Sequence, residues 1–266
     1  MNETDFIDVV WQRGRELRRD MPWRDDTRPY YVLVSELMLQ QTQVDRVIPK
    51  FSAFIECFPD IVSLAGASLA DVLTMWSGLV YNRRARYLHD AARMIAADCG
   101  GQFPTDYDGL VALPGVGPNT AGAILNYAFN TPTVFIETNV RTVYFHHFFP
   151  DGDIVHDNEL RPLIERTIDR DYPREFYWAL MDYGSWLKRQ GVGRIRQSQH
   201  YKKQAPLKGS LREVRGHIVR HLTQQDATAG QLQSLYPDDK RVPIAVDGLV
   251  RDGLVQQRGD LLHLTK

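Results

Sequence analysis

The residue in this chain best placed to do acid–base chemistry is Glu36, which lies in the segment SELMLQQT. The apolar residues around it have helical spacing, and its neighbours include Val34, Leu37 and Met38. Burying a carboxylate among such side chains is unfavourable unless it is paired or used. Burial also raises the pKa of a glutamic acid, so that it stays protonated long enough to donate a proton. Because a glutamate on an amphipathic helix is more often exposed, the pattern alone leaves both interpretations open.

A second candidate site is the segment LPGVGPNTAGAIL at 113–125. Two glycines two residues apart let the backbone approach an anion closely, and a helix beginning near Pro118 points its amides and its dipole at the same anion. A bare Gly-x-Gly could be a turn that only packs, but the whole string is far more specific. It predicts a helix-hairpin-helix motif that holds DNA phosphates without reading base sequence. The residues expected at the phosphate are Gly115, Val116, Gly117 and Thr120, with Val116 packed inward.

Two groups of cations could meet the same polyanion. The overall net charge is −1, which argues against a uniformly basic nucleic-acid binder. Locally, residues 188–203 carry six cations and no acid, and a second group is Arg83, Arg84 and Arg86. A basic run is usually a solvated loop, so this feature becomes informative only with further support. The six cations are Lys188, Arg189, Arg194, Arg196, Lys202 and Lys203.

Composition and length indicate a soluble globular protein of 266 residues with one large domain or two to three small ones. No apolar run reaches the roughly 18 residues of a membrane span, and residues 1–20 lack the pattern of a signal peptide. Cys57 and Cys99 are too few for a disulfide framework or a four-cysteine metal site. We expect a cytoplasmic protein, associated with the nucleoid if bacterial, without a membrane partner.

Helical periodicity dominates up to about residue 205, which predicts an all-α body. The expected elements include an amphipathic helix over 5–18, a loop from Met21 to Tyr31, two helices within 31–58, and helices over 68–76 and 83–98. Ser68 is a suitable N-cap for the helix over 68–76, and the helix over 83–98 ends before Gly100.

The pattern changes after Pro206. Three helices are expected over 210–222, 228–236 and 242–252, and residues 254–264 predict two strands around a Gly259–Asp260 turn. This order is typical of a small winged-helix-like α+β module. Such modules serve as nucleic-acid readers or as protein contacts, and the sequence leaves both roles open.

Six stretches together resemble the helix-hairpin-helix (HhH-GPD) base-excision DNA glycosylases, and within them the adenine glycosylase (MutY) branch. They are PWR at 22–24, VSELMLQQTQVDRVIPKF at 34–51, GLVYNRRARYLHDAA at 78–92, LPGVGPNTAGAIL at 113–125, ETNVRTV at 137–143 and ALMDYG at 179–184. The mismatch thymine/uracil glycosylases and the endonuclease III lyases share this scaffold and are the alternatives. The resemblance implies two helical lobes: a six-helix lobe over 25–130, and a second lobe formed by 1–24 and 131–205, with the winged-helix-like module at 207–266.

The resemblance also implies roles for individual residues. Glu36 matches the glutamate that protonates the base and then activates water, as catalysis at a base flipped out of the duplex requires. The corner after it and Tyr81 match the residues that enter the duplex at the vacated position, and the arginines beside Tyr81 suit phosphate contacts. The DNA-contact candidates here are Gln40, Gln41, Thr42, Tyr81, Arg83 and Arg84.

Three positions depart from the family pattern. Glu137 stands where the family has an aspartate that stabilises the sugar cation, and either it keeps that function or it mainly caps the helix beginning near Asn139. Asn139 matches the family's asparagine, a suitable partner for water or the carboxylates. Asn119 replaces the lysine of the lyases, which forms a Schiff base, and equally the serine or tyrosine of the other branches.

Two parts of the family pattern are missing. The basic loop 188–203 occupies the place of the four cysteines that hold a [4Fe–4S] cluster, with Leu187 near the first of them, so no cluster and no other cofactor is expected. Residues 207–266 do not match the Nudix-like domain that recognises 8-oxoguanine.

The sequence therefore predicts a monomeric glycosylase without lyase activity that acts on double-stranded DNA with a mismatched or damaged base. The default substrate is adenine opposite 8-oxoguanine or guanine. The alternatives are excision of thymine, uracil or a damaged base, or a catalytically inactive DNA-binding protein.

Overall fold

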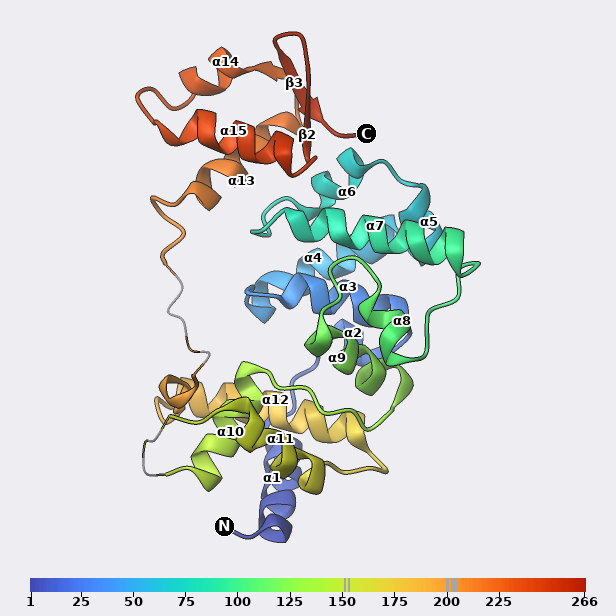
Figure 1. Cartoon of the computed structure of the whole chain (residues 1–266), viewed down its shortest axis with the longest axis vertical. Helices are drawn as coiled ribbons and strands as arrows, with labels where there is room; N and C mark the ends of the chain where they lie inside the picture. Colours follow the sequence, from blue (N-terminus) through green and yellow to red (C-terminus); the bar gives the residue numbers. More distant parts are fainter. Residues whose placement is uncertain (151, 153, 200, 202–204) are drawn as a thin grey trace. The chain divides into compact units, whose positions relative to one another are not determined.

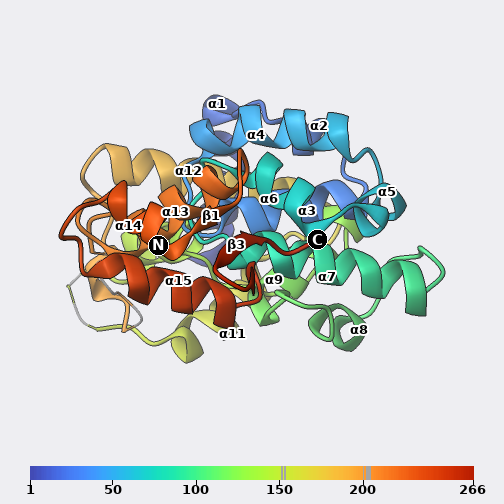
Figure 2. The same ribbon diagram turned by 90° about the horizontal axis from the view of Figure 1, so that it is seen from above.

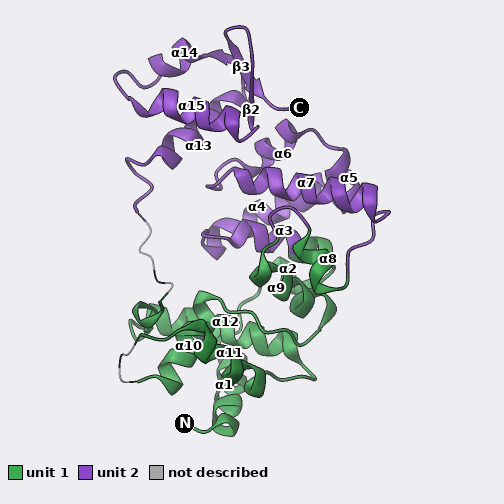
Figure 3. Cartoon of the chain, in the orientation of Figure 1, with its two compact units in different colours: residues 1–32, 105–112, 116–203 green, residues 33–104, 113–115, 204–266 purple. Residues whose placement is uncertain are grey.

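A computed structural model describes residues 1–150, 152, 154–199, 201 and 205–266, and the chain forms two compact units (Figures 1 and 3). Unit 1 comprises residues 1–32, 105–112 and 116–203, and unit 2 comprises residues 33–104, 113–115 and 204–266. The helix α3 (Pro29–Leu39) begins in unit 1 and continues into unit 2. No helix in the described part of the chain is long and apolar enough to cross a membrane.

Unit 1 is a helical unit in which α12 packs against both α1 and α10. The contact with α1 is close, because a Cβ built on Gly14 would lie 2.4 Å from the Cβ of Ala179. Its elements are α1 (Glu3–Leu17), α2 (Pro22–Asp25), α8 (Tyr107–Val111), α9 (Pro118–Phe129), α10 (Thr138–Phe148), α11 (Asp157–Thr167), α12 (Pro173–Arg189) and the 3-10 helix η1 (Ile195–Gln197).

A buried carboxylate joins two distant segments of unit 1. Asp182 of α12 is 2% exposed and receives Arg19 Nε at 2.6 Å and Arg24 Nη1 at 2.7 Å. The Arg24 guanidinium is itself buried and also lies over the ring of Trp178, 5.3 Å from its centroid. This ion cluster links the PWR stretch at 22–24 to the ALMDYG stretch at 179–184 within unit 1.

The first part of unit 2 is a group of helices that packs on the apolar surface of α3, whose Leu33, Val34, Leu37 and Met38 are buried. Its other elements are α4 (Val44–Cys57), α5 (Ile61–Gly66), α6 (Leu69–Trp76) and α7 (Arg83–Asp98). Ser68 caps α6 by accepting the amide of Asp71, as the sequence predicts.

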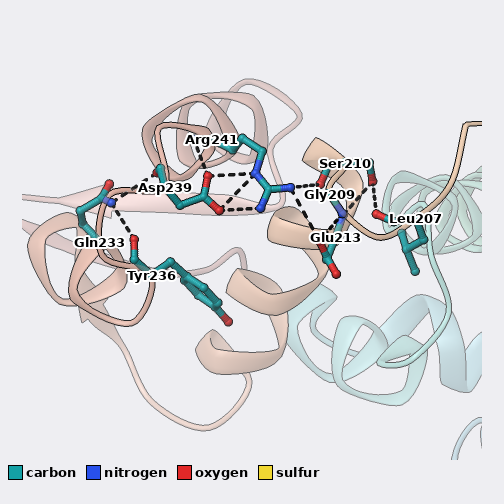
Figure 4. Close-up of polar contacts among 8 residues, drawn as sticks. All are labelled: Leu207, Gly209, Ser210, Glu213, Gln233, Tyr236, Asp239 and Arg241. Atoms are coloured by element: carbon teal, nitrogen blue, oxygen red, sulfur yellow. Dashed lines mark hydrogen bonds and ion pairs between the residues drawn. The ribbon is translucent and has the colours of Figure 1, made fainter.

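The C-terminal module of unit 2 contains three helices and a small sheet of strand order β1-β3-β2. In both views α13 lies against α15 (Figures 1 and 2). Arg241 binds Asp239 through two nitrogens and donates to the carbonyl of Ser210, which fixes the start of α13 to the α14–α15 connection (Figure 4). The elements are α13 (Leu211–Leu222), β1 (Ala227–Thr228), α14 (Ala229–Ser234), α15 (Arg241–Arg251), β2 (Val255–Arg258) and β3 (Leu261–Leu264).

The expected fold class, an all-α body with a small α+β module, is confirmed. Two local expectations were wrong. The segment expected as a loop contains α2 and the start of α3, since Pro22 and Pro29 each begin a helix, a position where proline costs nothing. The strand β1, which pairs with β3, was not expected. Helix α9 clusters with unit 1, whereas the sequence analysis placed it in the six-helix lobe, and the lobe boundaries stay a prediction.

The ion cluster at Asp182 gives a stability prediction. Asp182→Asn leaves the Arg24 guanidinium buried without its counter-charge, and breaking such a pair costs about 3–5 kcal/mol in the free energy of unfolding. The control is Asp26→Asn, since Asp26 pairs with the largely exposed Arg28 at 2.6 Å and should cost less than about 1 kcal/mol. Urea denaturation measures both, and equal losses would contradict the role of Asp182.

Candidate active site

Glu36 is the only charged residue of α3, and it is partly exposed between buried apolar neighbours. Ser35, Leu37 and Met38 on either side of it are at most 1% exposed. The packing of these neighbours therefore fixes the position of the Glu36 backbone. This is the arrangement that an acid–base group requires, because the group must hold its place while its protonation state changes.

Two corners of unit 2 carry residues with a left-handed backbone. The chain turns after α3 at Gln41, with φ of 57°, and before α7 at Tyr81, with φ of 63°. Only four described non-glycine residues have a positive φ. Two of the four are Gln41 and Tyr81, the residues that the sequence analysis expected to enter DNA. Such conformations are unfavourable for residues with a Cβ and concentrate at functional sites.

Arg84 holds both of these corners in place. Its guanidinium donates to the carbonyl of Leu37 at 2.5 Å, to that of Met38 at 2.9 Å and to Thr42 Oγ1 at 3.1 Å. It also donates to the carbonyl of Val80, the residue before Tyr81. The side chain is 6% exposed, and its burial lowers the pKa of the guanidinium to about 10. Arg84 is therefore an internal support, with Thr42 as one of its acceptors. Its burial gives no support to a contact of Arg84 with DNA, which stays a prediction.

The remaining residues of the second basic group face the C-terminal module within unit 2. Arg83 is 58% exposed and forms an ion pair with Asp252 at 3.0 Å. Arg86 donates to the backbone carbonyl of Asp252, and Arg212 donates to the hydroxyl of Tyr81. Sequence reasoning missed Asp252 and Arg212, because no local pattern relates residues so far apart in the chain.

The glycine turn before α9 has the local geometry expected of the hairpin. Gly115 has φ of 79°, and a Cβ there would lie 2.7 Å from the Cβ of Tyr87, so no side chain fits. Val116 is 4% exposed, which confirms that it packs inward. Gly117 is the N-cap of α9 and provides no side-chain cap, and Pro118 follows at the first helical position. The first amides of α9 are thus suited to an anion, and Thr120 lies partly exposed in this first turn.

In unit 1 the stretch leading to Glu137 is held by two side-chain clamps. Asn119 Nδ2 donates to the carbonyl of Ile136 at 3.2 Å, and the Ile136 amide donates to Asn119 Oδ1 at 3.3 Å. One residue earlier, the Tyr177 hydroxyl accepts from the amide of Phe135 and donates to its carbonyl. Asn119, a candidate catalytic residue, thus fixes the backbone beside Glu137.

Glu137 is the N-cap residue of α10, but its carboxylate accepts no capping hydrogen bond. The side chain is partly exposed, and desolvation raises its pKa, while the positive charges of Arg141 and Lys188 lower it. Lys188 thus lies close enough to act electrostatically on Glu137. The geometry gives no support to the interpretation of Glu137 as mainly a helix cap.

Asn139 follows in the first turn of α10, where α12 passes very close. A Cβ on Gly184 would lie 2.4 Å from the carbonyl oxygen of Asn139, so only glycine allows this approach. Asn139 Nδ2 contacts Met181 Sδ at 3.6 Å, and its Oδ1 is buried with no hydrogen-bond partner among the described residues.

The basic loop after α12 is only partly available to a polyanion. Arg194 donates to the carbonyls of Phe149 and Pro150, and Gln197 donates to the former at 3.1 Å. Arg189 and Arg196 are exposed, as is Lys188. Lys202 and Lys203 lie outside the described residues.

The residues present do not fit the iron–sulfur cluster that the resemblance would suggest. Its four thiolates cannot come from two cysteines, and neither Cys57 nor Cys99 lies in unit 1, where the loop that replaces the cluster is found. Among the described residues, no group of three or more His, Cys, Asp or Glu side chains is arranged to hold a metal ion.

Comparison with known proteins identifies the family to which the chain belongs. The HhH-GPD superfamily of base excision DNA repair proteins matches residues 34–167, which include the Glu36 helix, the hairpin and Glu137. The chain belongs to the HhH-GPD superfamily. Its relatives place this HhH-GPD protein in the MutY branch, as the resemblance indicated.

Among the curated relatives of this HhH-GPD protein, the adenine DNA glycosylase of Mycolicibacterium smegmatis is 33% identical over 91% of this chain and 90% of its own length. That of Buchnera aphidicola subsp. Baizongia pistaciae is 36% identical over 64% of this chain and 49% of its own. The chain thus spans about half the length of several curated relatives.

Solved structures agree in fold. A thermostable thymine-DNA glycosylase aligns with a TM-score of 0.63 at 24% identity, covering 69% of this chain and 86% of that one. A trapped endonuclease III–DNA covalent intermediate aligns with a TM-score of 0.56 at 20% identity, covering 77% and 91%. Both alignments show the HhH-GPD fold alone.

The support that Arg84 gives to the two corners can be measured. Arg84→Lys keeps the charge, but a single ammonium cannot reach the four acceptors of the planar guanidinium. We expect a loss of about 2–4 kcal/mol in the free energy of unfolding, because buried carbonyls lose their donors. Arg83→Lys on the exposed side of the same turn is the matched control and should cost less than about 1 kcal/mol. If the two variants melt alike in thermal denaturation, Arg84 has no supporting role.

Proposed function

We propose that this HhH-GPD protein is a monofunctional DNA glycosylase that hydrolyses the N-glycosidic bond of adenine mispaired with 8-oxoguanine or guanine. The observation that carries the proposal is Glu36, the single charged side chain on an otherwise apolar helix within the family match. The choice of adenine rests on the curated relatives, which are named adenine DNA glycosylases.

In the proposed reaction the duplex is held by its backbone and the base is turned out of the stack. The glycines of the hairpin and the start of α9 bind a phosphate, and Gln41 and Tyr81 fill the position that the base leaves. The left-handed corners support this, since they present both side chains on fixed backbone. Exposed cations such as Arg189 and Arg196 add sequence-independent attraction.

Glu36 then protonates the base, which makes it a better leaving group, and afterwards takes a proton from the attacking water. The developing charge on the sugar is positive, so an ionised carboxylate stabilises it, and Glu137 is the candidate for that role. The Glu137 carboxylate makes no capping hydrogen bond to α10, which supports this assignment.

Strand cleavage through a Schiff base is not part of the proposal. At the position where the lyases have lysine, this chain has Asn119, which has no nucleophilic amine and whose amide is bonded to the backbone of Ile136. We also propose that the protein works without an iron–sulfur cluster. Hydrogen bonds from Arg194 and Gln197 to the carbonyl of Phe149 support the loop in its place.

The substrate is tested with a panel of oligonucleotide duplexes. They contain adenine opposite 8-oxoguanine or guanine, thymine or uracil opposite guanine, and a few oxidised or alkylated bases. We expect cleavage after alkali only with the adenine duplexes, and no covalent trapping by borohydride. Absence of any cut with adenine would exclude adenine as the substrate, and cleavage of another duplex would name the base.

The assignment of Glu36 is tested on whichever duplex is cut. Glu36→Gln keeps the size and hydrogen-bonding capacity of the side chain but removes the acid. We expect single-turnover excision to fall at least about 100-fold, with DNA binding retained. Full activity in this variant would show that another group is the acid.

The role of Glu137 predicts a pH dependence. Its pKa is raised above the ordinary value of 4.5, so the stabilising carboxylate is lost, and excision slows, as the pH falls through this raised pKa. Lys188→Met removes a cation that lowers the pKa, and therefore should move the acidic limb of the rate profile to higher pH. The control is Arg189→Met. The guanidinium of Arg189 donates to Ser185 Oγ at 3.4 Å. The positive charges that lower the pKa of Glu137 are those of Arg141 and Lys188, so this variant should leave the limb in place. A limb unmoved by Lys188→Met would argue against Glu137 as the titrating group.

A further inference from the structure

The C-terminal module contacts the rest of unit 2 at the turn that carries Tyr81. One contact is made by Arg212 in the first turn of α13, whose guanidinium donates to the Tyr81 hydroxyl and lies 5.1 Å from the centroid of its ring. The second nitrogen of Arg212 donates to the carbonyl of Ala205 at 2.6 Å, so the guanidinium is fixed from both sides. Arg84 lies 5.7 Å from the same ring centroid. Two guanidinium groups, from segments far apart in the chain, thus hold one tyrosine.

The other contact is at Asp252, which ends α15. Its carboxylate binds Arg83 at 3.0 Å and Arg215 at 2.5 Å, and its carbonyl accepts from Arg86. The negative end of the α15 dipole adds to this attraction.

Two arginine side chains approach glycines near the Asp252 contact. A Cβ on Gly253 would lie 2.3 Å from Arg86 Nη1, and one on Gly248 would lie 2.5 Å from Arg215 Nη1. Arg86 of α7 therefore lies directly against the backbone of the module, whereas Arg215 belongs to α13 and packs within the module.

An open depression of about 570 Å³ lies beside this second contact, lined by Arg86, Val250, Gly253 and the strand β2. The attachment of the module near Tyr81 includes the polar contacts of Arg212 and Asp252, and each of these can be removed singly.

We propose that the C-terminal module is a positioning element for Tyr81, and that Arg212 is the residue through which it acts. This inference rests on the proposed function, in which Tyr81 enters the duplex. A tyrosine already held in one orientation loses less conformational freedom when it enters a base stack, so the base leaves the stack more readily. The role assigned to the module is thus support of the extrusion step and not of bond hydrolysis.

Extrusion is measured apart from catalysis in a Glu36→Gln background. The probe is a duplex with the fluorescent adenine analogue 2-aminopurine opposite guanine, at saturating protein concentration. Arg212→Ala should lower the equilibrium constant for extrusion about 5- to 30-fold, the effect of losing one hydrogen bond and one cation–π contact. Arg212→Lys, which keeps a cation near the ring, should recover most of it.

The matched control is Arg220→Ala, which removes the same charge from the exposed last turn of α13 and should leave extrusion unchanged. A second variant, Asp252→Asn, releases the other contact and should lower extrusion in the same direction without altering Arg212. Circular dichroism confirms that each variant keeps its helices.

A second readout separates positioning from a general structural loss. In the catalytically active protein, Arg212→Ala should slow single-turnover excision from a paired duplex but not from a bubble in which the adenine is already unpaired. Equal slowing on both substrates, or equal behaviour of the Arg212 and Arg220 variants, overturns the assignment. Increased extrusion in Arg212→Ala also overturns it, since the module would then be a cover over Tyr81.

The outcomes distinguish this inference from the proposed function. If Glu36→Gln produces no fluorescence change and the unaltered protein excises no base, the proposed function fails. If extrusion and excision occur but do not respond to Arg212, only the role of the module fails.

Discussion

The guanidinium of Arg84 is the interaction on which the two left-handed corners of unit 2 depend. A helix that ends at a functional corner leaves its last carbonyls without partners in the chain. Arg84 supplies donors to Leu37 and Met38 and at the same time to the turn before Tyr81. One buried cation therefore sets the end of the Glu36 helix and both left-handed corners together. Its desolvation is unfavourable, and the acceptors around it make it tolerable.

In unit 1, neutral side chains rather than a buried cation bind the backbone next to the candidate catalytic carboxylate. The stretch before Glu137 pairs with no strand in the described part of the chain, and the side chains of Asn119 and Tyr177 hydrogen-bond its backbone amides and carbonyls. In both units the candidate catalytic carboxylate stands on a backbone that other residues hold. Packing positions the backbone of Glu36, and hydrogen bonds to the preceding residues position that of Glu137. The backbone positions therefore do not depend on the protonation state of either carboxylate. The extra methylene of Glu137 relative to aspartate is accommodated at an N-cap that takes no bond from the side chain.

Much of the fold can be predicted from sequence signals that act within a few residues. The features that the sequence analysis missed depend on contacts between residues far apart in the chain. Ser68, Pro118 and Thr228 begin helices as expected, because capping and proline chemistry act within one turn. Arg83 and Arg84 looked equivalent in sequence, yet consecutive helical residues point about 100° apart, and only packing decides which is buried. The contact of Asp252 with Arg83 joins residues far apart in the chain, so no periodicity could reveal it. The strand β1 is two residues long and exists only through its pairing with β3.

The charge balance connects the module with DNA binding. A net charge of −1 is compatible with a DNA-binding surface only if cations and acids are separated locally. In unit 2 Asp252 lies against three arginines, so part of the positive field around α7 is neutralised inside the protein. In unit 1 Arg189 and Arg196 are exposed, whereas Arg194 is bonded to backbone carbonyls. In the proposed function, attraction to phosphates comes chiefly from these exposed cations and from the start of helix α9, while Arg84 and Arg212 hold Tyr81.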